Sequence, residues 1–251
     1  MMLTVDGAAR LVVPEGCHST QEPSLNALAN AAGDMMDSWQ RQINRIALAS
    51  TDDGMWAARN VVMSIPRQTG KTYDVEWIAI HRAATIPRIR IVWTAQHFSV
   101  LHDTFEDMCS RAARPEMSTL VDPEHGFSLA AGKEEIRFRN GSRIFFRARE
   151  RGALRGFKNI GLLVIDEAQI LSDAAKASML PTQNRAWNPQ TFYMGTPPGP
   201  RDMGESFTRQ RTQALAGRAH SVLYVEFSAD RDADPLDREQ WRKANPSYPT
   251  H

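Results

Sequence analysis

The sequence predicts an α/β domain of three layers, in which a central, mostly parallel sheet is flanked by helices. An apolar run at residues 61–65 leads through a polar turn into a helical pattern, and a second run at 162–165 ends in Asp166 and Glu167. Continuous apolar runs of strand length are typical of parallel strands buried on both faces. At 251 residues the chain can bury a large core as one domain of this class.

The turn after the first run reads Pro66-Arg67-Gln68-Thr69-Gly70-Lys71-Thr72 and ends in the Gly-Lys-Thr of a phosphate-binding loop. The backbone N–H groups of such a loop and the positive end of the next helix point at one place, which suits a polyphosphate. Lys71 would reach the β- and γ-phosphates, and the Thr72 hydroxyl would ligate Mg²⁺. Because Ile65 replaces the first glycine of the usual pattern, the loop alone leaves an ordinary strand–turn–helix junction open.

The acidic pair after the second run is a second site. Ligands of parallel α/β sheets bind at the carboxyl ends of the strands, so we expect Asp166 and Glu167 beside the phosphate loop. Asp166 would hold Mg²⁺, directly or through a water, and Glu167 would orient and deprotonate the water that attacks the γ-phosphate. Together the two sites favour a P-loop NTPase of the RecA-like (ASCE) type, with ATP and Mg²⁺ as cofactors, over a strand that ends in a solvated acidic turn.

Composition bears on the partners and the cellular compartment of the protein. The formal net charge is +1, so no overall field points to nucleic acid, although only five of the 30 basic residues are lysines. Arginine suits phosphate contacts, and a GC-rich genome would produce the same bias. Cys17 and Cys109 offer neither a disulfide framework nor a metal-binding spacing, which fits a reducing, cytosolic setting. The longest apolar runs are of strand length, so no membrane-spanning segment is expected.

The chain divides into three parts. Residues 1–33 are expected to form an N-terminal arm or edge decoration with a leading helix, 34–245 the main domain, and 246–251 the start of a linker. In the main domain, Asp34 or Asp37 is expected to cap the helix that carries Trp39. Further helices are expected after the phosphate loop, over 98–108, from 172 toward 180, near 207–215 and over 237–243.

Strands are predicted by apolar or alternating runs. Asn140-Gly141 accepts the positive φ angles of a tight turn and therefore predicts a hairpin between the strands that flank it. The predicted strands outside the two apolar runs lie at 88–95, 135–138, 143–147, 190–194 and 221–227.

Positive charge is concentrated between residues 137 and 158, where seven arginines and one lysine face a single acid, Glu150. Solvated faces usually intersperse acids among the bases, so this stretch favours a phosphate-facing role. The DNA backbone, ATP and a neighbouring subunit's ATP are the candidate partners.

Two polar residues stand near the predicted site. Gln40 lies off the apolar face of its helix, and its amide offers a donor and an acceptor that can pair with adenine; a solvated glutamine is the alternative. Thr196 follows the strand at 190–194, where its hydroxyl is placed to sense the γ-phosphate; a plain strand-to-loop turn is the alternative.

In order along the chain, these motifs resemble the ATPase domain of the large terminase subunit of tailed double-stranded DNA bacteriophages, from about residue 35 onward. The motifs are Trp39-Gln40, Pro66-Arg67-Gln68-Thr69-Gly70-Lys71-Thr72, Leu154-Arg155-Gly156, Val164-Ile165-Asp166-Glu167-Ala168 and Gly195-Thr196-Pro197. A phosphate loop that lacks its first glycine but carries an arginine is usual in that family, so Ile65 supports the resemblance.

The resemblance implies a role for each matching residue. Arg155 would be an arginine finger donated to the neighbouring subunit's ATP, with Arg149 and Arg151 as alternatives. Arg67 would link ATP binding to movement, and Thr196 would couple hydrolysis to motion. The implied nucleotide-binding residues are Gln40, Arg67, Gln68, Thr69, Gly70, Lys71, Thr72 and Thr196; the Mg²⁺ ligands are Thr72 and Asp166; the catalytic residues are Glu167, Lys71 and Arg155.

The family further implies a ring, commonly a pentamer, that docks on the portal of a procapsid in the host cytoplasm. With a small terminase subunit as partner, it would drive double-stranded DNA inward through sequence-independent backbone contacts. Its C-terminal nuclease is not visible in this sequence, so DNA cleavage is not expected from this chain. Two alternatives stay open: the first motor domain of a helicase-like translocase, and a non-hydrolysing nucleotide-binding assembly module, against which Glu167 argues.

Overall fold

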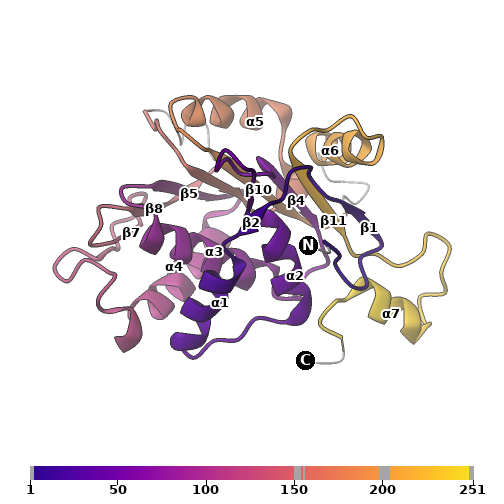
Figure 1. The fold of residues 1–251 in the computed structure, drawn as a ribbon, viewed down its shortest axis with the longest axis horizontal. Helices are drawn as coiled ribbons and strands as arrows, with labels where there is room; N and C mark the ends of the chain where they lie inside the picture. The colour runs from indigo at the N-terminus through magenta and orange to yellow at the C-terminus, as the bar shows by residue number, and fades with distance from the viewer. Residues whose placement is uncertain (1–2, 150–153, 155, 198–203, 249–251) are drawn as a thin grey trace.

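The computed structural model describes residues 3–149, 154, 156–197 and 204–248, and its centre is a nine-stranded sheet (Figure 1). The six strands from β11 to β8 are parallel. β1 pairs antiparallel at one edge, and β7 and β6 add antiparallel pairings toward the other. The predicted fold class is therefore confirmed. The spatial order is β1 (Arg10–Val12), β11 (Val222–Glu226), β4 (Asn60–Ser64), β10 (Gln190–Gly195), β9 (Leu162–Ile165), β5 (Arg90–Ala95), β8 (Arg143–Ala148), β7 (Glu135–Arg137) and β6 (Phe127–Ser128), while β2 (Ser19–Thr20) pairs separately with β3 (Ala49–Ser50).

Helices cover both faces of the sheet, with α1 to α4 below it and α5 and α6 above it in Figure 1. The α-helices are α1 (Glu22–Ala31), α2 (Ser38–Ala47), α3 (Lys71–Thr85), α4 (Phe98–Ala112), α5 (Asp173–Met179), α6 (Glu205–Leu215) and α7 (Arg238–Ala244); short 3₁₀ helices occupy Pro115–Met117, Ala168–Ile170 and Leu180–Gln183. Along β9, Leu162 and Val164 belong to the core between the sheet and α1 to α4. Leu163 and Ile165 belong to the core between the sheet and the helices α5 and α6. Burial on both faces explains why β9 is a continuous apolar run.

Local signals in the sequence agree with the observed elements. Asp37, one of the two predicted caps, is the N-cap residue of α2. Gly141 has a φ of +84° in the turn between β7 and β8, and the Asn140 amide donates to the Ala83 carbonyl at 2.9 Å. The N-terminal arm contributes β1, which pairs with β11 at the edge of the sheet. None of the helices in the described ranges is long and apolar enough to cross a membrane.

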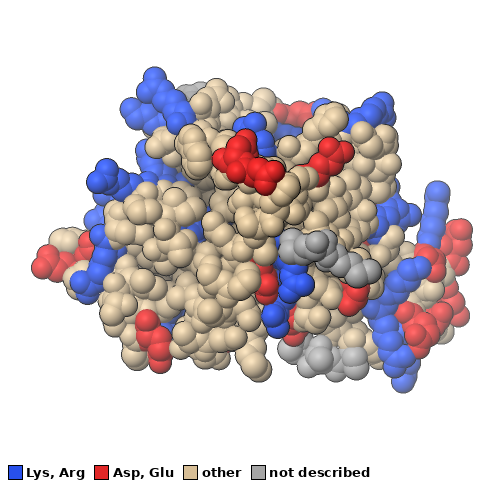
Figure 2. Space-filling view, in the orientation of Figure 1, with Lys and Arg blue, Asp and Glu red and all other residues tan. Residues whose placement is uncertain are grey.

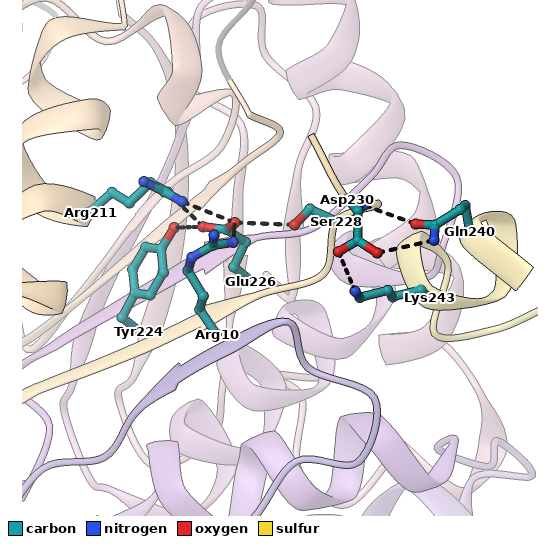
Figure 3. A network of polar contacts seen from close by, with 8 residues as sticks. All are labelled: Arg10, Arg211, Tyr224, Glu226, Ser228, Asp230, Gln240 and Lys243. Carbon is teal, nitrogen blue, oxygen red and sulfur yellow. Dashed lines mark hydrogen bonds and ion pairs between the residues drawn. The ribbon is translucent and has the colours of Figure 1, made fainter. Parts of the chain in front are cut away.

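A buried carboxylate, Glu226, ties this edge of the sheet together (Figure 3). Arg10 of β1 and Arg211 of α6 each donate to it at 2.7 Å, and the Tyr224 hydroxyl donates to it as well. Burial alone would raise the pKa of Glu226, but the hydrogen bonds from Arg211 and Tyr224 and the two positive charges outweigh burial and lower the pKa to about 2. Glu226 lies opposite Ser64 at the end of β4, so the cluster supports the strand that precedes the phosphate loop.

An amide–carboxyl pair joins α2 to α3 inside the core. Asn44 Nδ2 donates to Asp74 Oδ1 at 2.7 Å, and neither side chain is exposed. Asp74 Oδ2 and Asn44 Oδ1 are buried and have no hydrogen-bond partner within the described part of the chain. A proton on Asp74 would remove a buried charge and supply a donor beside an unpaired oxygen. Consistently, burial raises the pKa of Asp74 to about 8.

We expect the Asp74→Asn variant to be less sensitive to pH than the wild type. The folded wild type keeps a proton that the unfolded chain releases above about pH 4, so stability is lost as the pH rises from about 4 to about 8. In that range the unfolding free energy of the wild type should fall, relative to that of the variant, by about 1.4 kcal/mol per pH unit. Urea denaturation at several pH values measures the difference, and Glu76, whose pKa burial also raises to about 8, is common to both proteins. Parallel pH curves would show that Asp74 is charged in the folded state.

Candidate nucleotide-binding site

Three neighbouring parallel strands deliver the predicted site residues to one edge of the sheet. β10 lies between β4 and β9, and Gly195 of β10 lies opposite Ser64 of β4. Tyr193 of β10 lies opposite Ile165, the last residue of β9. The phosphate loop, the segment at Thr196 and the acidic pair therefore emerge side by side. This is the carboxyl edge of the strands, where α/β sheets bind ligands.

The phosphate loop curls around the Lys71 ammonium group. Gln68 and Gly70 have φ angles of +58° and +90°, a left-handed conformation that glycine adopts without strain. Lys71 Nζ donates to the Pro66 carbonyl at 3.2 Å, and the Thr69 hydroxyl donates to the same carbonyl at 3.1 Å. Burial lowers the pKa of Lys71, and the nearby charge of Asp166 opposes that shift. A buried ammonium group beside a neutral carbonyl fits an anionic ligand such as a polyphosphate.

The other predicted loop residues lie on either side of Lys71 in the sequence. Arg67 and Gln68 are exposed at the tip of the loop, where a bound nucleotide would meet them. Thr72 is half-buried in the first turn of α3. Thr72 and Asp166 are the residues that would hold Mg²⁺, since oxygen ligands are the ones this ion prefers and it retains waters and phosphate oxygens for its other positions.

The acidic pair is held in two different ways. Asp166 is 7% exposed, and burial raises its pKa, while a hydrogen bond from the Glu167 N–H and the charge of Lys71 oppose the rise. Glu167 has a φ of +51°, which is strained for a residue with a side chain. Its carboxylate accepts a hydrogen bond from the Gln96 backbone N–H at 3.1 Å. The loop between β5 and α4, to which the sequence assigned no function, therefore sets the position of Glu167.

Arg149 supports the acidic pair from within the same chain. Its guanidinium group donates to the Asp166 carbonyl and, at 3.2 Å, to the Glu167 carbonyl. Burial lowers the pKa of Arg149 to about 10, and the two carboxylates oppose the shift. These contacts give Arg149 a structural task inside its own subunit. Arg155 and Arg151, the other arginines considered for action on a neighbouring subunit, lie outside the described residues.

Two glutamines link the strand ends, and both are buried. Gln40 Oε1 accepts from the Asp37 N–H at 2.8 Å, and Gln40 Nε2 donates to the Gly70 carbonyl at 2.9 Å. The alternative of a solvated Gln40 is therefore wrong, because the amide bridges α2 to the phosphate loop. Gln169 Oε1 accepts from the Thr196 N–H at 3.3 Å and so connects the acidic segment to the strand end that carries Thr196. Gln169 stands beside the acidic pair in the sequence Asp-Glu-Ala-Gln, and this position could have identified it from the sequence.

The basic stretch is partly used within the protein. Arg137 Nε donates to Glu135 at 2.6 Å, Arg147 donates to the Glu134 carbonyl at 2.9 Å, and Arg139 donates to a loop carbonyl. Figure 2 shows Lys and Arg side chains along the left flank, the side on which β7 and β8 lie in Figure 1. Arg143 also lies 4.0 Å from a Glu135 carboxylate oxygen, but its side chain is 50% exposed. The phosphate-facing role of this stretch stays a prediction.

The sequence matches no family model and no curated protein. Solved structures do resemble the fold. The large terminase of bacteriophage HK97 matches with a TM-score of 0.76 and 18% identity, over 92% of this chain and 49% of that one. The large terminase of the thermophilic bacteriophage D6E matches with a TM-score of 0.50 and 10% identity, over 90% of this chain and 50% of that one.

A yeast DEAD-box splicing factor, Prp28, matches with a TM-score of 0.48 and 14% identity, over 82% of this chain and 52% of that one. A structural similarity this low does not support the helicase-like alternative. The chain spans about half the length of the two terminases that it matches. The resemblance drawn from the motifs is thus confirmed at the level of the fold, and the chain has the fold of the corresponding part of the HK97 large terminase.

Proposed function

We propose that this chain is the ATPase motor of a viral DNA-packaging terminase, which hydrolyses ATP to translocate double-stranded DNA into a procapsid. The observation that carries the proposal is the convergence of Lys71, the acidic pair and Thr196 at the carboxyl edge of three adjacent strands. A second support is the fold shared with the HK97 large terminase.

Hydrolysis would proceed by in-line attack of water on the γ-phosphate. Glu167, positioned by the Gln96 N–H, would accept the proton of the attacking water. Lys71 would offset the negative charge that develops on the phosphate oxygens, and Thr72 and Asp166 would hold Mg²⁺. When bound, Mg²⁺ would supply further charge neutralisation at the phosphates. Gln169, which accepts a hydrogen bond from the Thr196 N–H, would couple movement of the acidic segment to Thr196.

The proposal includes partners and a setting. The chain would assemble into a ring, of which a pentamer is the expected form, and would act with a portal protein and a small terminase subunit in the host cytoplasm. DNA would be held through its phosphates without regard to sequence, with an affinity that falls as salt rises. Arg155 would act on the ATP of the neighbouring subunit.

A subunit-mixing experiment tests the function and the role of Arg155 together. Arg155→Ala and Lys71→Ala proteins should each be inactive in Mg²⁺-dependent phosphate release, because one lacks the donated arginine and the other the phosphate-binding lysine. Mixed in the presence of DNA, they should regain activity at interfaces where an intact Lys71 meets an intact Arg155. An arginine finger contributes about 10³- to 10⁵-fold in rate, so partial recovery is measurable. A mixture that stays inactive would remove the trans role, and a wild-type ring that releases no phosphate would remove the proposed function.

A further inference from the structure

The segment that follows α7 folds back onto the phosphate loop. Ser247 is only 3% exposed. Its hydroxyl oxygen lies 2.9 Å from the Thr69 carbonyl oxygen and 3.1 Å from Asp37 Oδ2, and it accepts a hydrogen bond from the Trp39 indole N–H at 3.0 Å. One hydroxyl group thus joins the C-terminal segment, the first turn of α2 and the phosphate loop.

Hydrogen bonds within the segment shape it into a turn. The Ser247 N–H donates to Asn245 Oδ1 at 3.0 Å, and the Tyr248 N–H donates to the Asn245 carbonyl at 3.1 Å, so residues 245–248 form a turn. Trp39, whose indole N–H donates to the Ser247 hydroxyl, packs edge-on against Phe227, with 6.0 Å between the ring centroids. The serine hydroxyl is therefore presented to the loop from a packed position.

Peptide geometry shows what this contact does to the loop. In a planar trans peptide, the C=O and the N–H of the next residue point in opposite directions. Because the Thr69 carbonyl is turned toward Ser247, the Gly70 N–H points away from Ser247. In the next peptide, Gln40 Nε2 donates to the Gly70 carbonyl at 2.9 Å. The Lys71 N–H therefore points away from Gln40. Consecutive N–H groups at the start of a helix are those that contact a bound phosphate.

We propose that Ser247 is a positioning residue that orients the phosphate loop for nucleotide, and that docking of residues 245–248 and phosphate binding strengthen each other. The proposal rests on the proposed function, in that this loop must bind ATP. Ser247 acts through the backbone of Thr69 and Gly70, and so its effect falls on the phosphates rather than on the base. Such a coupling is reciprocal, because a segment that favours nucleotide binding is itself favoured by bound nucleotide.

Binding measurements on the Ser247→Ala variant test the proposal, with Ser247→Thr as the rescue that keeps a hydroxyl. Ser178→Ala is the matched control, because Ser178 is an exposed serine on α5 whose hydroxyl donates to the Ala175 carbonyl. Loss of one oriented hydrogen bond should weaken the binding of Mg·ADP and of inorganic tripolyphosphate by the same factor, about fivefold. KM for ATP should rise by a similar factor while kcat is retained, and Ser247→Thr and Ser178→Ala should bind as the wild type does.

The possible results distinguish failure of the proposed role of Ser247 from failure of the proposed ATPase function. A purely structural Ser247 would lower the melting temperature of the free protein by a few degrees and leave both dissociation constants unchanged; that result would overturn the inference. A loss of ADP affinity without a loss of tripolyphosphate affinity would also overturn it, because the effect would then lie on the base side. If the wild type binds neither ligand, the proposed function falls first.

Discussion

Replacing Glu167 by glutamine is expected to abolish ATP turnover and to leave ATP binding intact. The glutamine side chain has the same shape and can still accept the hydrogen bond that the Gln96 N–H now donates at 3.1 Å. It cannot take a proton from the attacking water, and loss of a general base typically costs about 10²- to 10⁴-fold in rate. Lys71, Thr72 and Asp166, which would bind the phosphates and Mg²⁺, are unchanged in this variant.

The comparison requires both a rate and a dissociation constant. Steady-state phosphate release gives kcat, and titration with a fluorescent ATP analogue gives the affinity. Glu106→Gln serves as the control, because Glu106 is an exposed carboxylate on α4 and its replacement should change neither quantity. Normal turnover in the Glu167→Gln protein would exclude Glu167 as the base, and loss of binding would place its main role in holding nucleotide.

The sequence predicts those parts of this structure that depend on short-range signals. The apolar run at 162–165 coincides with β9, because burial on both faces requires an apolar residue at every position. The Asn140-Gly141 turn is local in the same sense, since it depends on the positive φ of +84° that Gly141 adopts without strain. The parallel order of the strands then brings the phosphate loop and the acidic pair to one edge, as the general rule for α/β sheets predicts.

The contacts that organise the site could not be predicted from the sequence. Gln40 reaches Gly70 across 30 residues of sequence, and Ser247 reaches Thr69 across 178. Gln40 closes a local capping box with Asp37, but that pattern does not predict the bond to Gly70, and Ser247 carries no local pattern at all. Arg149 is similar: the charge count around it predicts a phosphate-facing role, but its guanidinium group donates to the backbone carbonyls of Asp166 and Glu167. Long-range polar contacts depend on the packed fold and not on periodicity.

Removing the Glu226 carboxylate should be the most destabilising change at the β11 edge. Glu226 is 4% exposed, and its loss leaves Arg211 and the Tyr224 hydroxyl without their acceptor. Breaking a buried charge pair from one side costs about 3–5 kcal/mol, and we expect Glu226→Ala to lie near the lower value because the Arg211 side chain, 38% exposed, can turn toward solvent. Arg10→Ala, which removes a 45%-exposed partner of the same carboxylate, should cost less than about 1 kcal/mol.

The pH dependence distinguishes this charge cluster from simple loss of packing. The pKa of Glu226 is lowered to about 2 in the folded protein, so its contribution is present above the unfolded value of about 4.3 and is lost as the pH falls through about 2. The gap in unfolding free energy between wild type and Glu226→Ala should therefore narrow in acid, as measured by urea denaturation at neutral and acidic pH. A gap that stays constant would assign the loss to a cavity. Because Arg211 belongs to α6 and Glu226 lies opposite Ser64, a narrowing gap would also mean that the strand leading into the phosphate loop is anchored by charge.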